Sequence, residues 1–420
     1  MALALYRGVM GGLSPAVLRA RVKHGKEDGA RLAERKGIAS RARPDGTLIW
    51  IHGASVGESL SVLPLVSALL ERPNRHVLVT TGTVTSAKLM EERLPMGAFH
   101  QYVPIDSLQS VRRFLAHWQP DGALFVESEL WPNLILETRR RSIPMALVNA
   151  RLSAQSFRGW HYAPRLARRI LSCFDACLAQ DDAIAKRLIA LGAGDVRISG
   201  SLKADAPPLP VDEKALDDFR ASTGTRPIFL AASIHPGEVD AILQAARNLL
   251  GPHPGALTVI VPRHPQRGAD IAAEAALRGF SVRRRAAGML PSPETQIYIA
   301  DTLGELGLFY RATPFAFIGG SLVPHGGQNP LEPARLETAI LAGPQTQNFE
   351  EIFRVLLHAQ GEGRVHSPEE LGLLAARLIA DPSVAARLGA NARAAAETLG
   401  GALAATITLT ESMLRSHARA

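Results

Sequence analysis

The sequence is poor in cysteine and in long apolar runs, and both absences narrow the class of protein. Only two of its 420 residues are cysteine, Cys173 and Cys177, too few for a disulfide framework or a zinc site built from cysteine alone. The low count indicates a reducing compartment, and we expect both to be buried packing residues. No segment reaches the ~18 consecutive apolar residues that a membrane-spanning helix needs.

Several cofactor motifs are also missing. No GxxxxGK[ST] loop is present, which disfavours a P-loop nucleotidase, and no GxGxxG follows the first predicted strand, which disfavours a simple dinucleotide dehydrogenase. The 13 histidines are scattered and form no HExxH. We therefore expect neither a metal site nor a cofactor.

The sequence contains enough apolar residues to form large hydrophobic cores. The chain is 46% hydrophobic and 20% charged, which excludes a disordered protein. At roughly 100–200 residues per domain, its length predicts two or three domains.

Positive charge is concentrated at the N-terminus. Residues 1–43 hold ten Lys and Arg against three acidic residues, whereas the remaining chain holds 37 basic and 36 acidic residues. A nearly neutral body predicts weak duplex binding and no nucleic-acid partner. An interfacial helix in the first 18 residues followed by a basic segment instead predicts docking on an anionic membrane surface. The alternative is an ordinary N-terminal helix that packs on the body.

Short apolar runs alternate with helical patterns from residue 47 onward, which predicts parallel sheets with βαβ connections. Strands are predicted at 47–53, 76–82, 122–128, 144–150, 176–180, 228–234, 257–263, 281–285, 297–301, 315–320 and 339–344. Helices are predicted at 59–71, 84–93, 107–117, 181–191, 238–250, 269–278, 303–310 and 368–398. A proline-rich stretch at 203–215 predicts a linker between two doubly wound α/β domains that face each other across a cleft.

These patterns predict four segments. They are a membrane-docking segment at 1–43, an acceptor-binding α/β domain at 44–205, a nucleotide-sugar-binding α/β domain at 206–400 and a C-terminal helix at 401–420 that crosses back to the first domain.

Candidate residues of the first domain follow its strands, where ligands of parallel sheets bind. In HGASVGES (52–59), Gly57 is expected to allow a tight turn, and Glu58 is either a general base or an ordinary first-turn helix residue. FVESELWPNL (125–134) contains the carboxylates Glu127 and Glu129. Lys203 either balances charge on an anionic donor or is simply solvated.

The second domain is richer in anion-binding signals. Arg263 and His264 end a strand, and Asp301 is expected to cap a helix whose first turn contains Gly304 and Glu305. The loop GGSLVPHGGQNPLEPA (319–334) allows close backbone approach to a ligand, and its Glu332 can accept hydrogen bonds from ribose hydroxyls. ASIHPGE (232–238) is a further loop of this kind.

Six of these segments, in order, resemble the 3-deoxy-D-manno-octulosonic acid (Kdo) transferases of lipopolysaccharide synthesis. They are SVGE (55–58), ESELWPNLI (127–135), NARLS (149–153), PRH (262–264), DTLGELG (301–307) and the loop 319–334. The resemblance implies a GT-B fold and an inverting transfer of Kdo from CMP-Kdo to a lipid A precursor. Gln328 stands where histidine is common in that family.

The resemblance also implies roles for single residues. Glu58 matches the general base, with Ser55 and Gly57 in the acceptor loop. Glu129 matches a second essential carboxylate, and Lys203 matches a lysine that stabilises the transition state. The segments that match the CMP-binding site contain Pro262, Arg263, Leu303, Gly304, Glu305, Asn329, Pro330, Leu331 and Glu332.

The expected partners are therefore CMP-Kdo, the lipid A precursor and the cytoplasmic face of the inner membrane, on which the protein is expected to be peripheral. One alternative is a sugar-nucleotide 2-epimerase of the same fold, which predicts UDP binding and no lipid acceptor. The other is a non-enzymatic protein that binds anionic membranes or nucleic acid. It would leave the Glu58, Lys203 and Arg263 loops without a purpose.

Overall fold

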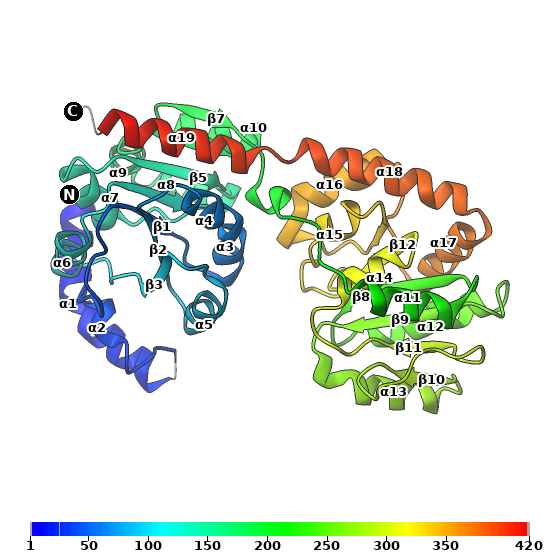
Figure 1. The fold of residues 1–420 in the computed structure, drawn as a ribbon. Coiled ribbons are helices and arrows are strands. Elements are labelled where there is room, and N and C mark those ends of the chain that lie inside the picture. Colours follow the sequence, from blue (N-terminus) through cyan, green and yellow to red (C-terminus); the bar gives the residue numbers. More distant parts are fainter. Residues whose placement is uncertain (1, 25, 418–420) are drawn as a thin grey trace. The chain divides into compact units, whose positions relative to one another are not determined.

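The computed structural model describes residues 2–24 and 26–417. The chain forms two compact units, Met1–Ala206 together with Gly400–Ala420, and Pro207–Leu399, each with its own parallel sheet (Figure 1). Residues 1, 25 and 418–420, which belong to the expected N-terminal segment and C-terminal helix, lie outside the described residues.

The first unit is built on a seven-stranded sheet whose paired strands are all parallel, in the order β3-β2-β1-β4-β5-β6-β7. Its strands are β1 (Thr47–His52), β2 (Arg75–Thr81), β3 (Ala98–Tyr102), β4 (Gly122–Val126), β5 (Met145–Ala150), β6 (Ala176–Ala179) and β7 (Val196–Ile198). The order reverses between β1 and β4, where Ile49 lies between Val77 of β2 and Gly122 of β4. Doubly wound sheets bind ligands at such a reversal, outside the carboxyl ends of the strands.

The helices of the first unit lie before, between and after these strands along the chain. They are α1 (Ala2–Lys23), α2 (Leu32–Arg35), α3 (Val56–Ser61), α4 (Leu63–Leu70), α5 (Val84–Arg93), α6 (Leu108–Trp118), α7 (Pro132–Arg140), α8 (Ala154–Trp160), α9 (Pro164–Leu171), α10 (Asp182–Ala190), the 3-10 helix η1 (Leu202–Asp205) and α19 (Ala402–His417). Ser55, Thr83 and Asp181 cap α3, α5 and α10, each accepting a backbone N–H bond. The last helix, α19, packs on α4, β4, β5 and β6 and so belongs to the first unit.

The core of the first unit has one layer on each face of the sheet. Leu48 and Trp50 of β1 pack in one layer, and Ile49 and Ile51 pack in the other together with Met413 of α19. Successive strand residues point to opposite faces, so a strand covered on both faces is apolar throughout. Burial of both faces of the sheet therefore explains the continuous apolar runs in the sequence.

The second unit repeats the architecture with six parallel strands in the order β10-β11-β9-β8-β12-β13. Its strands are β8 (Ile228–Ile234), β9 (Leu257–Pro262), β10 (Val282–Arg284), β11 (Ile297–Ile299), β12 (Phe315–Ile318) and β13 (Ala339–Ala342). The order reverses between β8 and β12, so a ligand site is expected at their carboxyl ends.

The helices of the second unit cover both faces of its sheet. They are α11 (Glu213–Thr223), α12 (Val239–Leu250), η2 (Pro265–Arg267), α13 (Gly268–Leu277), α14 (Leu306–Arg311), α15 (Leu331–Ala334), η3 (Gln347–Phe349), α16 (Glu350–Gln360), α17 (Pro368–Ala380) and α18 (Pro382–Thr398). Phe229, Ile260 and Phe317 of the sheet pack with Leu243 of α12 and Leu388 of α18.

Prolines divide two of the predicted helices. Residues 59–71 form part of α3 and all of α4, because Pro64 lacks an N–H and its ring conflicts with continued helix from the preceding turn. Residues 368–398 form α17 and α18, which meet at Asp381 before Pro382. Strands β3 and β7 were not predicted; in β3 the polar His100 and Gln101 interrupt the apolar residues.

Asp301 does not have the expected role of a helix cap. Its carboxylate accepts from Arg284 Nη2 at 2.7 Å and from the backbone N–H of Ala286 at 3.0 Å. Helix α14 begins at Leu306 with Glu305 at its N-cap, later than the sequence suggested. The carboxylate thus joins β10 to the end of β11 rather than closing a helix.

The N-terminal segment packs on the first unit. Tyr6 Oη donates to Asp106 at 2.7 Å, and Arg7 Nε donates to Asn133 Oδ1 at 2.9 Å. Across the described residues, every helix is too short or too polar to cross a membrane. Helix α1 contacts the rest of the first unit through Tyr6 and Arg7 and is longer than the predicted interfacial stretch.

Part of the positive charge in residues 1–43 is used inside this unit. Arg35 is 6% exposed and donates to Glu27 Oε2 at 2.9 Å and to two backbone carbonyl oxygens. Arg31 Nη2 donates at 2.9 Å to Glu34, which is 1% exposed. These partners could not be read from the charge count. Among the side chains of the segment that the structure describes, the exposed lysines and arginines are Lys23, Lys26, Lys36 and Arg41.

His100 of β3 lies beside these cations and is held neutral. Its Nδ1 lies 3.0 Å from Arg31 Nη2, and because a guanidinium only donates, Nδ1 accepts and Nε2 donates to Thr81 Oγ1 at 2.9 Å. Burial and the positive charges of Arg31 and Arg35 lower the pKa of His100 to about 3.

We expect the first unit to lose stability as the pH falls from 6.5, the ordinary pKa of histidine, towards about 3. In that range the unfolded chain binds a proton at His100 and the folded chain does not, so the unfolding free energy falls by up to about 1.4 kcal/mol per pH unit. Urea unfolding at pH 7 and pH 4.5 measures the loss. His100→Gln should reduce it, and the exposed control His117→Gln should not. An equal loss in His100→Gln would contradict the prediction.

Candidate functional site

The first group of polar residues lies at the carboxyl end of β1, where the strand order reverses. Glu58 is in the first turn of α3. Its Oε1 accepts from Ser55 Oγ at 2.7 Å, its Oε2 accepts from the backbone N–H of Ala54 at 2.7 Å, and its own N–H donates to Ser55 Oγ at 3.3 Å. The loop after β1 and the start of the helix thus fix the carboxylate.

Gly57 is not needed for this turn. Its φ lies outside the left-handed region, and a Cβ at this position would have no heavy atom within 4 Å. The expectation that Gly57 permits a tight turn is therefore wrong. Gly57 is exposed beside Glu58 and keeps that surface free of a side chain.

The environment of Glu58 favours a bound proton. Burial raises the pKa of its carboxyl, and the negative charges of Glu129 and Glu127 raise it further, against the opposing hydrogen bonds from Ser55 and Ala54. A carboxylate with a raised pKa accepts a proton more readily at neutral pH, which is the property of a general base.

The second group follows β4, the other strand at the reversal. Glu127 has a left-handed backbone, with φ of 56°, and is buried. Its Oε1 accepts from Lys203 Nζ at 3.0 Å. Lys203 lies in η1, whose first turn is capped by Ser201 Oγ. Lys203 is therefore paired with Glu127 and is not simply solvated.

Glu129 is held by two neighbours. It accepts from Trp131 Nε1, and its Oε2 lies 3.3 Å from Nε2 of the fully buried His52. Burial alone would raise the pKa of Glu129, but His52 and Trp131 outweigh it and lower the pKa. Glu58 and Glu129 thus have opposite shifts, an arrangement that separates a base from a permanently charged carboxylate.

Asn149 at the end of β5 connects η1 to the sheet. Its backbone is left-handed, with φ of 50°, and its Oδ1 accepts from the backbone N–H of Leu202 at 3.1 Å and from Gln180 Nε2 at 3.1 Å. The amide therefore positions the turn that carries Lys203. The run NARLS (149–153) marked the segment through the family resemblance, but not this contact.

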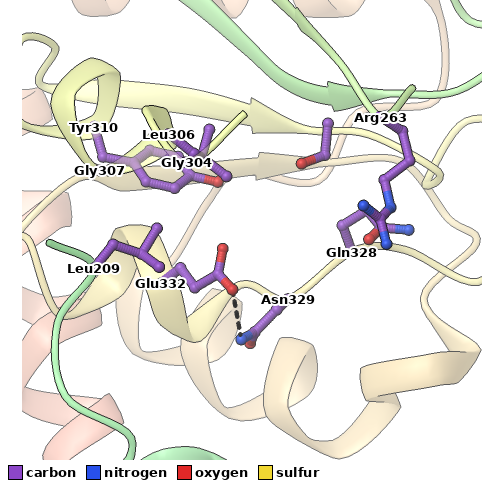
Figure 2. Close-up of a pocket in the computed structure, with 10 residues that line it drawn as sticks. Leu209, Arg263, Gly304, Leu306, Gly307, Tyr310, Gln328, Asn329 and Glu332 are labelled. Atoms are coloured by element: carbon purple, nitrogen blue, oxygen red, sulfur yellow. Dashed lines mark hydrogen bonds between the residues drawn. The ribbon is translucent and has the colours of Figure 1, made fainter. Parts of the chain in front are cut away.

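A pocket of about 250 Å³ lies at the corresponding place in the second unit, after β8, β9 and β12. Figure 2 shows its lining, with Arg263 beside Gln328 and away from Tyr310. The full lining consists of Leu209, Ser233, Arg263, Gly304, Leu306, Gly307, Tyr310, Gln328, Asn329 and Glu332.

Four of the nine residues predicted to bind CMP line this pocket, namely Arg263, Gly304, Asn329 and Glu332. Pro262 lines a smaller hollow with His235 and His264. The other four lie outside the lining: Leu303 is exposed, Pro330 and Leu331 are buried, and Glu305 pairs with Arg285.

Glu332 points toward Asn329 in this pocket (Figure 2). Its Oε1 accepts from Asn329 Nδ2 at 3.2 Å, while Asn329 Oδ1 accepts from the backbone N–H of Leu331 at 3.1 Å. Burial raises the pKa of Glu332, against the opposing effects of Asn329 and the charges of Arg335 and Arg263. The carboxyl oxygens of Glu332 can accept hydrogen bonds from a ligand's hydroxyl groups.

The loops around the pocket are joined by Glu238, which is fully buried. Its Oε2 accepts from the backbone N–H groups of His235 at 3.0 Å and Gly320 at 2.7 Å, and its Oε1 accepts from those of Ser321 at 3.1 Å and Leu322 at 3.0 Å. One carboxylate therefore binds the loop after β8 to the loop after β12. Sequence analysis had singled out the segment 232–238, but not this residue.

Imidazoles gather beside Arg263. The ring of His235 lies 4.1 Å from that of His325 and 6.2 Å from that of His264, and its Nε2 accepts from Gln328 Nε2 at 2.8 Å. Burial and the neighbouring His325, Arg263 and His264 lower the pKa of His235 to about 4. His235 is thus neutral at pH 7, and the exposed guanidinium of Arg263 remains available for an anion.

The structure thus contains a carboxylate with a raised pKa and charged neighbours in the first unit, and a polar pocket that includes a guanidinium in the second. In the described part of the chain, no three His, Cys, Asp or Glu side chains are grouped to hold a metal ion. The two cysteines are buried and unpaired with each other.

Known proteins are similar to this chain over most of its length. Residues 30–206 match the family model described as 3-deoxy-D-manno-octulosonic-acid transferase (kdotransferase). The 3-deoxy-D-manno-octulosonic acid transferase of Haemophilus influenzae is 39% identical over 344 residues, which cover 80% of each chain. That of Bordetella pertussis is 35% identical over 376 residues, which cover 87% of each chain.

Solved structures share the fold. The UDP-GlcNAc 2-epimerase of Neisseria meningitidis bound to UDP-GlcNAc superposes with a TM-score of 0.58 at 14% identity, covering 88% of this chain and 100% of that one. At this identity the likeness shows the GT-B-type architecture alone.

Proposed function

Because this chain belongs to the 3-deoxy-D-manno-octulosonic acid (Kdo) transferase family, we infer that it is a glycosyltransferase that moves Kdo from CMP-Kdo to a lipid A precursor in lipopolysaccharide synthesis. The observation that carries this proposal is the 39% identity with a Kdo transferase over 80% of the chain. The base geometry around Glu58 supports it independently.

The proposed reaction is an inverting displacement. Glu58 removes the proton of an acceptor hydroxyl, the hydroxyl oxygen attacks the anomeric carbon of Kdo, and the bond from that carbon to the phosphate oxygen breaks with its electron pair, releasing CMP. Glu129 remains negatively charged and lies near the proposed position of the acceptor. Lys203 stabilises negative charge in the transition state, as donors in preorganised sites do.

The pocket of the second unit is proposed to bind the donor. Arg263 contacts the phosphate, since a guanidinium matches its geometry, and Glu332 accepts from the ribose hydroxyls. The remaining proposed contacts are Pro262, Leu303, Gly304, Glu305, Asn329, Pro330 and Leu331. We propose that the reaction needs no metal or organic cofactor, because phosphate is already a good leaving group and Arg263 supplies charge.

The two alternative functions, an epimerase and a non-enzymatic binding protein, explain fewer of these observations. An epimerase shares the fold at 14% identity, whereas the transferases share more than twice that identity over most of the chain. A non-enzymatic membrane or nucleic-acid binding protein gives no role to a carboxylate base fixed by Ser55 and Ala54.

The test is transfer by the full chain from freshly made CMP-Kdo to a tetraacylated lipid A precursor, followed by mass spectrometry of the product. We expect a product heavier by whole Kdo units, whose number gives the number of sugars added. UDP-GlcNAc epimerisation without Kdo transfer would overturn the proposal.

Replacing Glu238 should weaken CMP binding. Glu238→Gln puts an amide N–H₂ where backbone N–H groups now point, so the loops after β8 and β12 lose bonds that hold the pocket. An unsatisfied buried bond costs ~1–3 kcal/mol, so we expect a rise in the CMP dissociation constant of roughly 10- to 100-fold. Calorimetric titration measures it, with exposed Asp240→Asn as control. Unchanged affinity would show that the loops keep their shape without this carboxylate.

We further propose that the exposed cations Lys23, Lys26, Lys36 and Arg41 place the protein on the cytoplasmic face of the inner membrane. Each basic group near an anionic surface contributes about 1 kcal/mol, so replacing all four by glutamine should reduce binding to phosphatidylglycerol vesicles by more than about tenfold. Vesicle sedimentation measures this, with phosphatidylcholine vesicles as control. Equal binding by the variant would place the contact elsewhere.

A further inference from the structure

A second cavity, of about 420 Å³, lies in the first unit at the carboxyl ends of β3, β2, β1 and β4. Residues of helix α1 and of the loops that follow these strands line it. Its apolar wall is formed by Met10, Leu18, Val103, Pro104, Ile105 and Trp131. The volume lies within the ~300–1,000 Å³ that is typical of cavities for small ligands.

The charged groups in the wall are already paired within the protein. Arg21 Nε and Arg35 Nε donate to the two carboxylate oxygens of Glu27, at 2.6 and 2.9 Å. Asp106 accepts from Tyr6 Oη at 2.7 Å and from backbone N–H groups of α7. Because these contacts satisfy the charges, the cavity favours an uncharged, apolar occupant over a nucleotide or a sugar.

The cavity shares residues with the candidate active site. Ser55 and Ala54 line it and also hold the two carboxylate oxygens of Glu58, each at 2.7 Å. Trp131, which is 41% exposed, lines it and donates to Glu129. An occupant of the cavity therefore ends beside both carboxylates.

We propose that this cavity binds one fatty acyl chain of the lipid acceptor and thereby brings the acceptor sugar to Glu58. The inference rests on the proposed function, which supplies an acceptor with acyl chains. The wall that the cavity shares with the candidate active site favours an acyl chain as the occupant. A chain that lies between α1 and the strand ends would place its sugar headgroup beside the residues that hold Glu58. Burying the chain uses remote binding energy to position the reacting hydroxyl.

The test compares two acceptors with each variant, the tetraacylated lipid A precursor in detergent and its fully deacylated sugar backbone. Met10→Trp and Ile105→Trp fill the cavity from two separate elements, α1 and the loop after β3. Met96→Trp, at a position 97% exposed in the same unit, is the control. We expect the wild type and the control to prefer the acylated acceptor, and both filled variants to lose roughly tenfold or more of that preference in kcat/KM. Transfer to the deacylated backbone and CMP affinity should stay unchanged.

A direct measurement separates the cavity from membrane docking. Titration with the fluorescent fatty acid cis-parinaric acid should show saturable binding to the wild type and to Met96→Trp, and a loss of binding in both filled variants, with vesicle binding unaltered. An unchanged acyl preference in both filled variants, or fatty acid binding that survives in them, would overturn the acyl-chain site. If the wild type transfers Kdo to neither acceptor, the proposed function is what fails.

Discussion

Glu58→Gln is expected to reduce Kdo transfer by roughly 10²–10⁴-fold, the usual contribution of a positioned general base. The glutamine keeps the size of the side chain but cannot take the proton of the acceptor hydroxyl. Initial rates at saturating CMP-Kdo measure the loss. CMP affinity should not change, because the pocket proposed to bind the nucleotide belongs to the second unit.

The exposed control Glu71→Gln should transfer Kdo at the wild-type rate. A Glu58→Gln protein that retains wild-type transfer would return Glu58 to the alternative role of an ordinary first-turn helix residue.

The pH profile supplies a second readout of the same base. Because a general base acts only in its deprotonated form, the proposed role of Glu58 predicts that kcat/KM rises with pH through the pKa of Glu58. Burial and the charges of Glu129 and Glu127 raise that pKa above the ordinary 4.5. Glu129→Gln removes one of these negative charges, so the acid limb of its residual activity should move to lower pH. A limb that moves to higher pH would contradict the assignment.

Lys203→Met should lower kcat by about 10²–10³-fold, as does the loss of one donor to a developing negative charge in other enzymes. Its ammonium group is 3.0 Å from the buried Glu127, so a simpler explanation is that it only neutralises that carboxylate. The single variant does not separate these roles, because it also leaves Glu127 without this cation.

The double variant Glu127→Gln with Lys203→Met separates them. If Lys203 acts only by neutralising Glu127, the double variant should recover transfer, since the buried charge is gone as well. A role in the transition state predicts that it stays as slow as Lys203→Met. The exposed control Lys186→Met should be unaffected. Thermal unfolding of each variant shows whether the pair also stabilises the fold.

Local sequence was sufficient to predict where most strands lie. Strand β1 contains the continuous apolar run 48–51 because both of its faces are buried. Such a run can be recognised in the sequence without knowledge of distant contacts. Strand β3 escaped prediction because His100 and Gln101 interrupt its apolar residues, and their partners Arg31 and Trp118 lie far away along the chain.

In the candidate active site too, residues in short motifs were predicted, whereas contacts between distant residues were not. Glu58, Glu129 and Lys203 were identified from short motifs, because strand ends at a reversal of strand order are the places where ligands bind. The supporting residues were missed. His52 is a buried histidine at the end of an apolar strand, and nothing near it in sequence shows that it lies beside Glu129.

Sequence by itself therefore determined the α/β class, the family and the residues at the strand ends, since these depend on hydrophobic periodicity and on contiguous motifs. Only the tertiary structure decided which charges are paired. Glu127 meets Lys203 across 76 residues, and Glu238 meets the 320–322 loop across more than 80. Such contacts follow from the crossovers that bring distant strand ends together. The apolar cavity beside Glu58 likewise depends on tertiary packing, because residues of α1 line it together with the loops after the strands.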